Sequence, residues 1–125
     1  MSAAYVDTSC LVAIAFGEPG AASLGRRLNS FDELVSSSFL EAEIRSAFKR
    51  ERIPFEVRVL SDISLLIPDR LLTEEIERVL EVGYVRGADC WHIANALYLA
   101  PSGDIAFITL DEPQRKAARQ LGFTV

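Results

Sequence analysis

Apolar and polar residues alternate along the chain in short blocks that predict strands and helices in turn. A first apolar run ends at Asp7, and a second forms a short helix that stops at Gly17. The predicted elements are a strand at 5–6, helices at 11–16 and 24–31, a strand at 34–36, helices at 37–52 and 56–65, a strand at 66–72, helices at 73–81 and 88–100, a strand at 105–109, a helix at 113–121 and a strand at 123–125.

This order of elements predicts the fold class. Strands separated by helices pair in parallel, so we expect an α/β protein with three layers, α/β/α, around a mostly parallel central sheet. A chain of 125 residues suffices for one domain, and no linker or repeat divides residues 1–125. Ligands collect at the carboxyl ends of parallel strands, and Asp7 and Asp111 each follow an apolar strand.

Glu43 lies on the apolar face of its predicted helix. Leu40 precedes it by three residues and Ala47 follows it by four, so all three share one helix face. Glu41 is on the opposite face, four residues before Arg45, as expected of an exposed ion pair. A carboxylate on a buried face needs a cation or a hydrogen-bond network. The alternative is an edge position from which the side chain reaches solvent.

Three aspartates at the starts of predicted helices have a simpler alternative interpretation. Asp7, Asp89 and Asp111 each suit a helix N-cap, and for Asp89 alone capping is the better interpretation. However, the predicted fold brings two strand ends and two inward helix faces towards one edge of the sheet. Carboxylate oxygens are ligands suited to Mg²⁺ or Mn²⁺, and such an ion can activate water and stabilise charge on a phosphodiester.

Four short segments in this order resemble PIN-domain nucleases, and among these most of all the VapC toxins of bacterial and archaeal toxin–antitoxin pairs. The segments are Tyr5-Val6-Asp7-Thr8-Ser9, Ser37-Ser38-Phe39-Leu40-Glu41-Ala42-Glu43-Ile44, Ala88-Asp89-Cys90-Trp91-His92-Ile93-Ala94-Asn95-Ala96 and Thr109-Leu110-Asp111. The resemblance spans nearly the whole chain. It implies a Mg²⁺- or Mn²⁺-dependent endoribonuclease that forms a homodimer and is inhibited by a cognate antitoxin protein.

Carried over residue by residue, the resemblance implies roles for single side chains. The metal-site and catalytic acids are Asp7, Glu43, Asp89 and Asp111. The supporting residues are Thr8 or Ser9, with Thr109 beside the fourth acid. Cys90 and Trp91 stand where small and aliphatic residues are more usual, and Glu112 makes the fourth acidic position ambiguous. Neither departure removes a ligand.

His92 and Trp91 follow Asp89 on the same predicted helix. His92 is the only histidine and shares a helix face with Asp89. We interpret it as a packed, hydrogen-bonded residue, because the resemblance gives it no metal or base role. Trp91 is interpreted as a core or dimer contact rather than a platform on which RNA bases stack.

The net charge of −5 is unusual for a protein that binds a polyanion. Part of that charge belongs to the acidic cluster and is neutralised when a cation is bound. For RNA contact the best basic group is Arg45, Lys49, Arg50 and Arg52, with Arg115, Lys116 and Arg119 on the last predicted helix. Charges at such spacings are more often only the solvated face of a helix.

The remaining features narrow the class of protein. No apolar run is long enough to span a bilayer and no signal-like segment begins the chain, so we expect a cytoplasmic protein. Cys10 and Cys90 belong to no cysteine motif and are interpreted as buried free thiols. Glycine-rich nucleotide-binding motifs are absent. The main rival is a catalytically inactive PIN-like module that binds RNA or protein, although such a module would be expected to have lost an acid.

Overall fold

Four short parallel strands form the centre of the molecule. The computed structural model describes residues 2–125, and in it the strands are β1 (Ala3–Val6), β2 (Glu33–Ser37), β3 (Ile63–Leu66) and β4 (Ala106–Ile108). Their order in the sheet is β3-β2-β1-β4, with every neighbouring pair parallel. β1 and β2 therefore lie in the middle. The predicted parallel sheet is confirmed.

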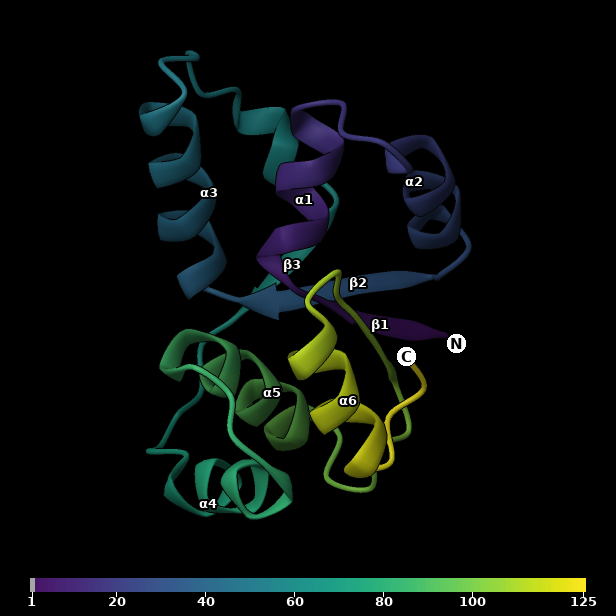
Figure 1. Ribbon diagram of the computed structural model, residues 1–125, viewed down its shortest axis with the longest axis vertical. Coiled ribbons are helices and arrows are strands. Elements are labelled where there is room, and N and C mark those ends of the chain that lie inside the picture. Colours follow the sequence, from purple (N-terminus) through teal and green to yellow (C-terminus); the bar gives the residue numbers. More distant parts are fainter. Residues whose placement is uncertain (1) are drawn as a thin grey trace.

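Helices cover both faces of this sheet. α1 (Thr8–Ala15), α2 (Ala21–Asn29) and α3 (Phe39–Arg50) lie on one side, and α4 (Thr73–Val82), α5 (Gly87–Leu99) and α6 (Glu112–Gln120) lie on the other (Figure 1). A 3-10 turn, η1 (Val57–Leu60), connects α3 to β3. The chain is thus an α/β protein with the three layers that the sequence predicted.

The alternation of side chains along β1 divides the core between the two faces. Tyr5 points into the larger cluster, where it stacks on Phe107 against α5 and α6. Ala4 and Val6 point to the other face, in a cluster with Leu28 of α2. All three β1 side chains are fully buried. The central strand is therefore apolar on both faces, as expected where helices cover each side.

The sequence-based boundaries are wrong between residues 56 and 72. The predicted helix at 56–65 is only the turn Val57–Leu60, and the predicted strand at 66–72 is instead β3, Ile63–Leu66. Pairing with β2 decides this register, since Ser36 stands opposite Leu65. Pro68 has no N–H to donate to a sheet, which fits the end of pairing before it. The predicted strand at 123–125 is a single bridge between Ala106 and Thr124.

Two further expectations concern the thiols and the membrane. Cys10 and Cys90 are buried and unpaired, as predicted. Between residues 2 and 125 no helix has the length and apolar character to cross a membrane.

Candidate active site

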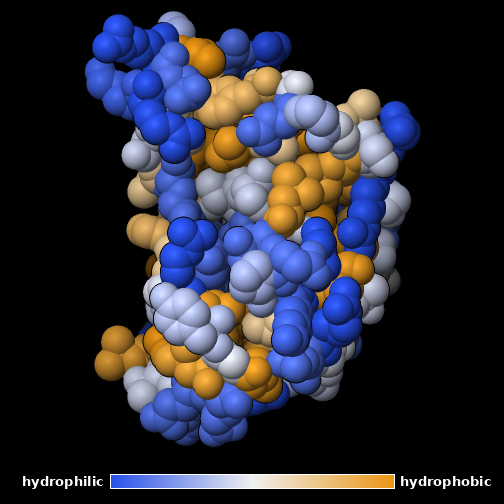
Figure 2. All heavy atoms as spheres, viewed as in Figure 1, coloured by the Kyte–Doolittle hydropathy of each residue, from blue (hydrophilic) through white to orange (hydrophobic). Residues whose placement is uncertain are grey.

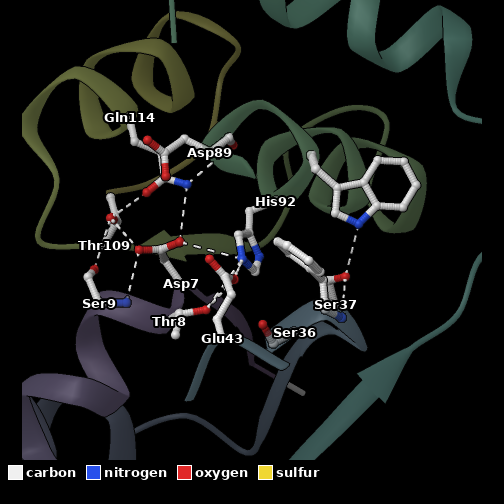
Figure 3. Close-up of polar contacts among 12 residues, drawn as sticks. Asp7, Thr8, Ser9, Ser36, Ser37, Glu43, Asp89, His92, Thr109 and Gln114 are labelled. Carbon is white, nitrogen blue, oxygen red and sulfur yellow. Dashed lines mark hydrogen bonds and ion pairs between the residues drawn. The ribbon is translucent and has the colours of Figure 1, made fainter. Parts of the chain in front are cut away.

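The four predicted acids line one open hollow at the carboxyl end of the sheet. Asp7 directly follows β1, Asp111 lies beyond the end of β4, Glu43 is on α3 and Asp89 is on α5. All four contribute to the lining of the same hollow. The labelled side chains of Asp7, Glu43 and Asp89 in Figure 3 show this convergence from three separate elements. Parallel pairing of β1 with β4 places the carboxyl ends of both strands at the same edge of the sheet. This explains why Asp7 and Asp111 line one hollow although they are far apart in the sequence.

Asp7 is buried, and two N–H groups donate to its carboxylate. One carboxylate oxygen accepts the Ser9 backbone N–H at 3.1 Å and the Thr109 hydroxyl lies 3.2 Å away. The other oxygen accepts the Gln114 side-chain amide at 3.3 Å. Asp7 is therefore the N-cap of α1, as the simpler interpretation proposed. Capping uses one carboxylate oxygen, and the Gln114 amide bonds the other.

Glu43 faces inward, and its neighbour Glu41 faces solvent. The hydroxyl of Thr8 donates to Glu43 Oε1 at 2.7 Å, and His92 Nε2 lies 2.6 Å from the same oxygen. Glu41 instead accepts a hydrogen bond from Arg45 at 2.7 Å, with both side chains nearly half exposed. The two glutamates therefore lie on opposite faces of α3, as their spacing predicted.

Asp89 is not a helix cap, so the capping interpretation of this residue is wrong. The N-cap of α5 is Arg86, and Asp89 stands in the first turn, where the helix dipole favours a negative charge. Burial raises the pKa of Asp89, and the negative charges of Asp7 and Asp111 raise it further. Repulsion among these carboxylates thus adds to the effect of burial. A cation among them would relieve that repulsion.

Asp111 caps α6 and also lines the hollow. Its side chain accepts the Gln114 backbone N–H at 2.9 Å. Arg86 reaches towards both aspartates, with guanidinium nitrogens 3.6 Å from Asp89 and 4.0 Å from Asp111. The Arg86 side chain is 76% exposed, so these are weak, screened ion pairs. Glu112, the residue that made this position ambiguous, pairs with Arg115.

Of the three hydroxyl groups predicted to support the acids, those of Thr8 and Thr109 lie beside a carboxylate and that of Ser9 does not. Thr8 donates a hydrogen bond to Glu43. The Thr109 hydroxyl lies 3.2 Å from Asp7 and 2.6 Å from Gln114 Oε1. It also accepts the Asp111 backbone N–H at 3.1 Å. Thr109 has one proton to donate, and the shorter distance assigns it to Gln114. Ser9 accepts the Leu110 N–H at 3.1 Å, which joins α1 to the loop after β4.

His92 was left out of the site by sequence analysis, and the structure places it beside two of the acids. It is fully buried and hydrogen-bonded, as predicted. Its partner Glu43 is a predicted site residue, and Nε2 is 3.8 Å from Asp7. The available signal was its position three residues after Asp89. Trp91 is partly buried against the core and donates to Ser37 at 3.2 Å, which fits the core interpretation.

Sequence reasoning also missed Gln114, Arg86 and Glu18. Gln114 is fully buried and bonds Asp7, and its signal was its place three residues after the N-cap Asp111. Arg86 and Glu18 both line the hollow. Arg86 lies three residues before Asp89, which gave a usable signal, whereas Glu18 follows a turn whose direction the sequence does not indicate.

The predicted basic group is divided between two places. Arg50 lines the acidic hollow, whereas Arg45 and Lys49 line a separate hollow beside Phe55. Arg45 lies over the Phe55 ring at 4.3 Å and pairs with Glu41, and Arg50 pairs with Glu51 at 3.2 Å. Arg50 and Arg86 therefore stand closer to the acids than the other two basic residues.

The donors at this site suit a hard divalent cation. The lining side chains supply carboxylate oxygens, and sulfur is absent from the lining. Among residues 2–125, no three acidic, histidine or cysteine side chains already stand in a geometry that could hold an ion. The observation that fits a cation is that the four predicted carboxylates line one hollow.

Comparison with known proteins gives one family and one relative. The PIN domain family matches residues 4–120. A relative from Mycobacterium tuberculosis named Ribonuclease VapC46 is 31% identical over 134 aligned positions, which cover all of this chain and 97% of that protein. No solved structure matches the chain.

Proposed function

The chain belongs to the PIN domain family, and from that premise we propose that it is a metal-dependent endoribonuclease, the toxin of a type II toxin–antitoxin pair. The observation that carries the proposal is the convergence of Asp7, Glu43, Asp89 and Asp111 on one hollow. A full-length relative named as a ribonuclease supports RNA as the substrate. Each of the four acids that the family resemblance requires is present in the chain.

The acids would hold Mg²⁺ or Mn²⁺, which when bound supplies positive charge for the phosphodiester and lowers the pKa of the attacking water. Around it, the chain's own residues have separate tasks. Thr109 holds Gln114, whose amide donates to Asp7, and Thr8 holds Glu43. Side chains fixed in this way need little reorganisation during reaction, which is where preorganised sites gain rate.

Arg50 and Arg86 would bring the RNA backbone to the acids. Both line the hollow, and Arg86 is mostly exposed. A guanidinium binds a phosphate through two parallel hydrogen bonds. Arg45 and Lys49 remain predicted RNA contacts further from the acids.

Self-association and an antitoxin are part of the same proposal. Several large apolar side chains are exposed, among them Leu71 at 85%, Tyr84 at 82% and Ile67 at 76%. On the face shown in Figure 2, hydrophilic residues form a band across the middle, with apolar patches on either side. Such patches are costly on a small monomer and support a homodimer. A cytoplasmic location stays a prediction.

The test is cleavage of RNA by the purified chain with Mg²⁺ or Mn²⁺ and with excess chelator. We expect cleavage only with metal, because the acids by themselves bring no positive charge to the reacting phosphate. Asp7→Asn, purified in the same way, controls for contaminating nucleases. Equal cleavage by the parent in chelator, or by Asp7→Asn with metal, would refute the proposal. Metal binding without any cleavage would favour the inactive binding module.

A further inference from the structure

His92 connects Glu43 to the buried interior through both nitrogens of its ring. Nε2 is 2.6 Å from Glu43 Oε1, and Nδ1 is 2.8 Å from the hydroxyl of Tyr5. That hydroxyl accepts the Ser37 backbone N–H at 2.9 Å. The chain of contacts therefore runs from α3 through α5 to β1 and β2. His92 and Tyr5 are fully buried, so water does not compete for the bond between them.

The partners decide where the ring carries its proton. The Tyr5 oxygen already accepts the Ser37 N–H, and its own hydrogen remains to be donated to Nδ1. A carboxylate accepts hydrogen bonds and donates none, so Nε2 must carry the hydrogen that points at Glu43. The Tyr5 ring also stands edge-on to the imidazole, with centroids 5.8 Å apart, which restricts rotation of the histidine.

The same contacts restrict what Glu43 can present to the hollow. Oε1 accepts both the Thr8 hydroxyl and the His92 N–H, which uses its two lone pairs. Among residues 2–125, no hydrogen bond uses Oε2. Figure 3 shows Glu43 between Thr8 and His92, with Asp7 beside it.

We propose that His92 is a positioning residue of the acidic site, whose Nε2–H fixes Oε1 of Glu43 so that Oε2 alone is offered to a divalent cation. The inference rests on the proposed metal-dependent function. Its physical basis is that a hydrogen bond from a neighbouring residue holds the carboxylate in the orientation that binds the metal. Binding then costs less side-chain conformational entropy, because the side chain is already fixed.

Two substitutions separate the bonds of the two ring nitrogens. In His92→Gln the side-chain amide nitrogen reaches the place of Nε2 and can still donate to Glu43. In His92→Asn the shorter amide reaches only the place of Nδ1, beside Tyr5. The two variants are matched in chemistry, and both replace an aromatic ring in the core, so their shared loss of packing cancels in the comparison.

The measurement is the dissociation constant of Mn²⁺ for the parent and both variants, by titration calorimetry. Loss of a hydrogen-bond partner of a metal ligand typically weakens binding about 10- to 100-fold. We expect a weakening of that size in His92→Asn and recovery of most of it in His92→Gln. Equal dissociation constants in the two variants would overturn the inference. If the parent itself bound no Mn²⁺, the proposed function would fail, and this inference with it.

A second measurement needs no variant and covers the case in which both fail to fold. His92 is the only histidine, so the imidazole ¹⁵N signals of the metal-free parent belong to it alone. We expect Nε2 to carry a proton. An unprotonated Nε2 would overturn the inference whatever the metal data show.

Discussion

The contrast between Glu43 and Glu41 gives the sharpest test of the site. The two residues are on one helix and two positions apart, yet one faces the hollow and the other faces solvent. Glu43→Gln keeps the shape of the side chain and removes its charge. The amide oxygen can still accept from Thr8 and His92, while the amide nitrogen that replaces Oε2 cannot bind a cation.

The cost to folding follows from those two bonds. Hydrogen bonds to a charged group contribute about 1.5–3 kcal/mol and neutral ones about 1 kcal/mol. The change therefore weakens each of the two bonds by roughly 1 kcal/mol. We expect the metal-free variant to fold, with a free energy of unfolding about 2 kcal/mol below that of the parent.

The cost to activity is much larger. Loss of a partner outside the metal ligands costs up to about 100-fold, so loss of a ligand should exceed that factor. Glu41→Gln loses only an exposed ion pair with Arg45, about 0.3–0.5 kcal/mol, and should keep its activity.

The assay is metal-dependent RNA cleavage together with melting temperature, with and without Mn²⁺, for the parent and both variants. Bound metal stabilises the folded state, so Mn²⁺ should raise the melting temperature of the parent and of Glu41→Gln but not of Glu43→Gln. Equal loss of activity in the two variants, or loss only in Glu41→Gln, would show that the assignment of helix faces to roles is wrong.

Three further predictions concern stability and assembly. Burial and the charges of Asp7 and Asp111 raise the pKa of Asp89 in the folded state, so its ionisation destabilises the metal-free protein as the pH rises through that pKa. Asp89→Asn should therefore have a higher melting temperature than the parent near pH 7. This difference in melting temperature should disappear below about pH 4, the ordinary range of an aspartate. A gap that widens with acid would contradict this sign. Thr109→Val removes the donor to the side-chain oxygen of the fully buried Gln114, and a denaturant titration should show a free energy of unfolding lower by about 1–3 kcal/mol. Thr124→Val is the matched control at an exposed position and should change the free energy of unfolding by less than about 0.5 kcal/mol. Light scattering should give a particle of twice 13.8 kDa, and overproduction of the chain without an antitoxin should arrest growth; a monomer at high concentration, or normal growth, would count against the toxin assignment.

Much of the fold was accessible to sequence analysis because local patterns carry it. The alternation of apolar strands with amphipathic helices predicted the layers and the parallel sheet, and most helix boundaries agree within two residues. The predicted elements between residues 56 and 72 were wrong because β3 exists only through its pairing with β2. A strand of four residues has little stability by itself, so its partner, not its own pattern, decided its position.

The acids could also be named from sequence, since helical spacing turns Glu43 inward and strand ends place Asp7 and Asp111 at one edge of the sheet. That they share one hollow depends on tertiary structure. Tertiary structure also decides the hydrogen bonds of His92 with Glu43 and Tyr5 and that of Gln114 with Asp7. The partners in these bonds are separated in the sequence by 49, 87 and 107 positions, respectively. Local periodicity shows which side of an element a residue takes. Contacts over such distances are decided by the packing of whole elements, because only the folded core brings these side chains within hydrogen-bonding distance.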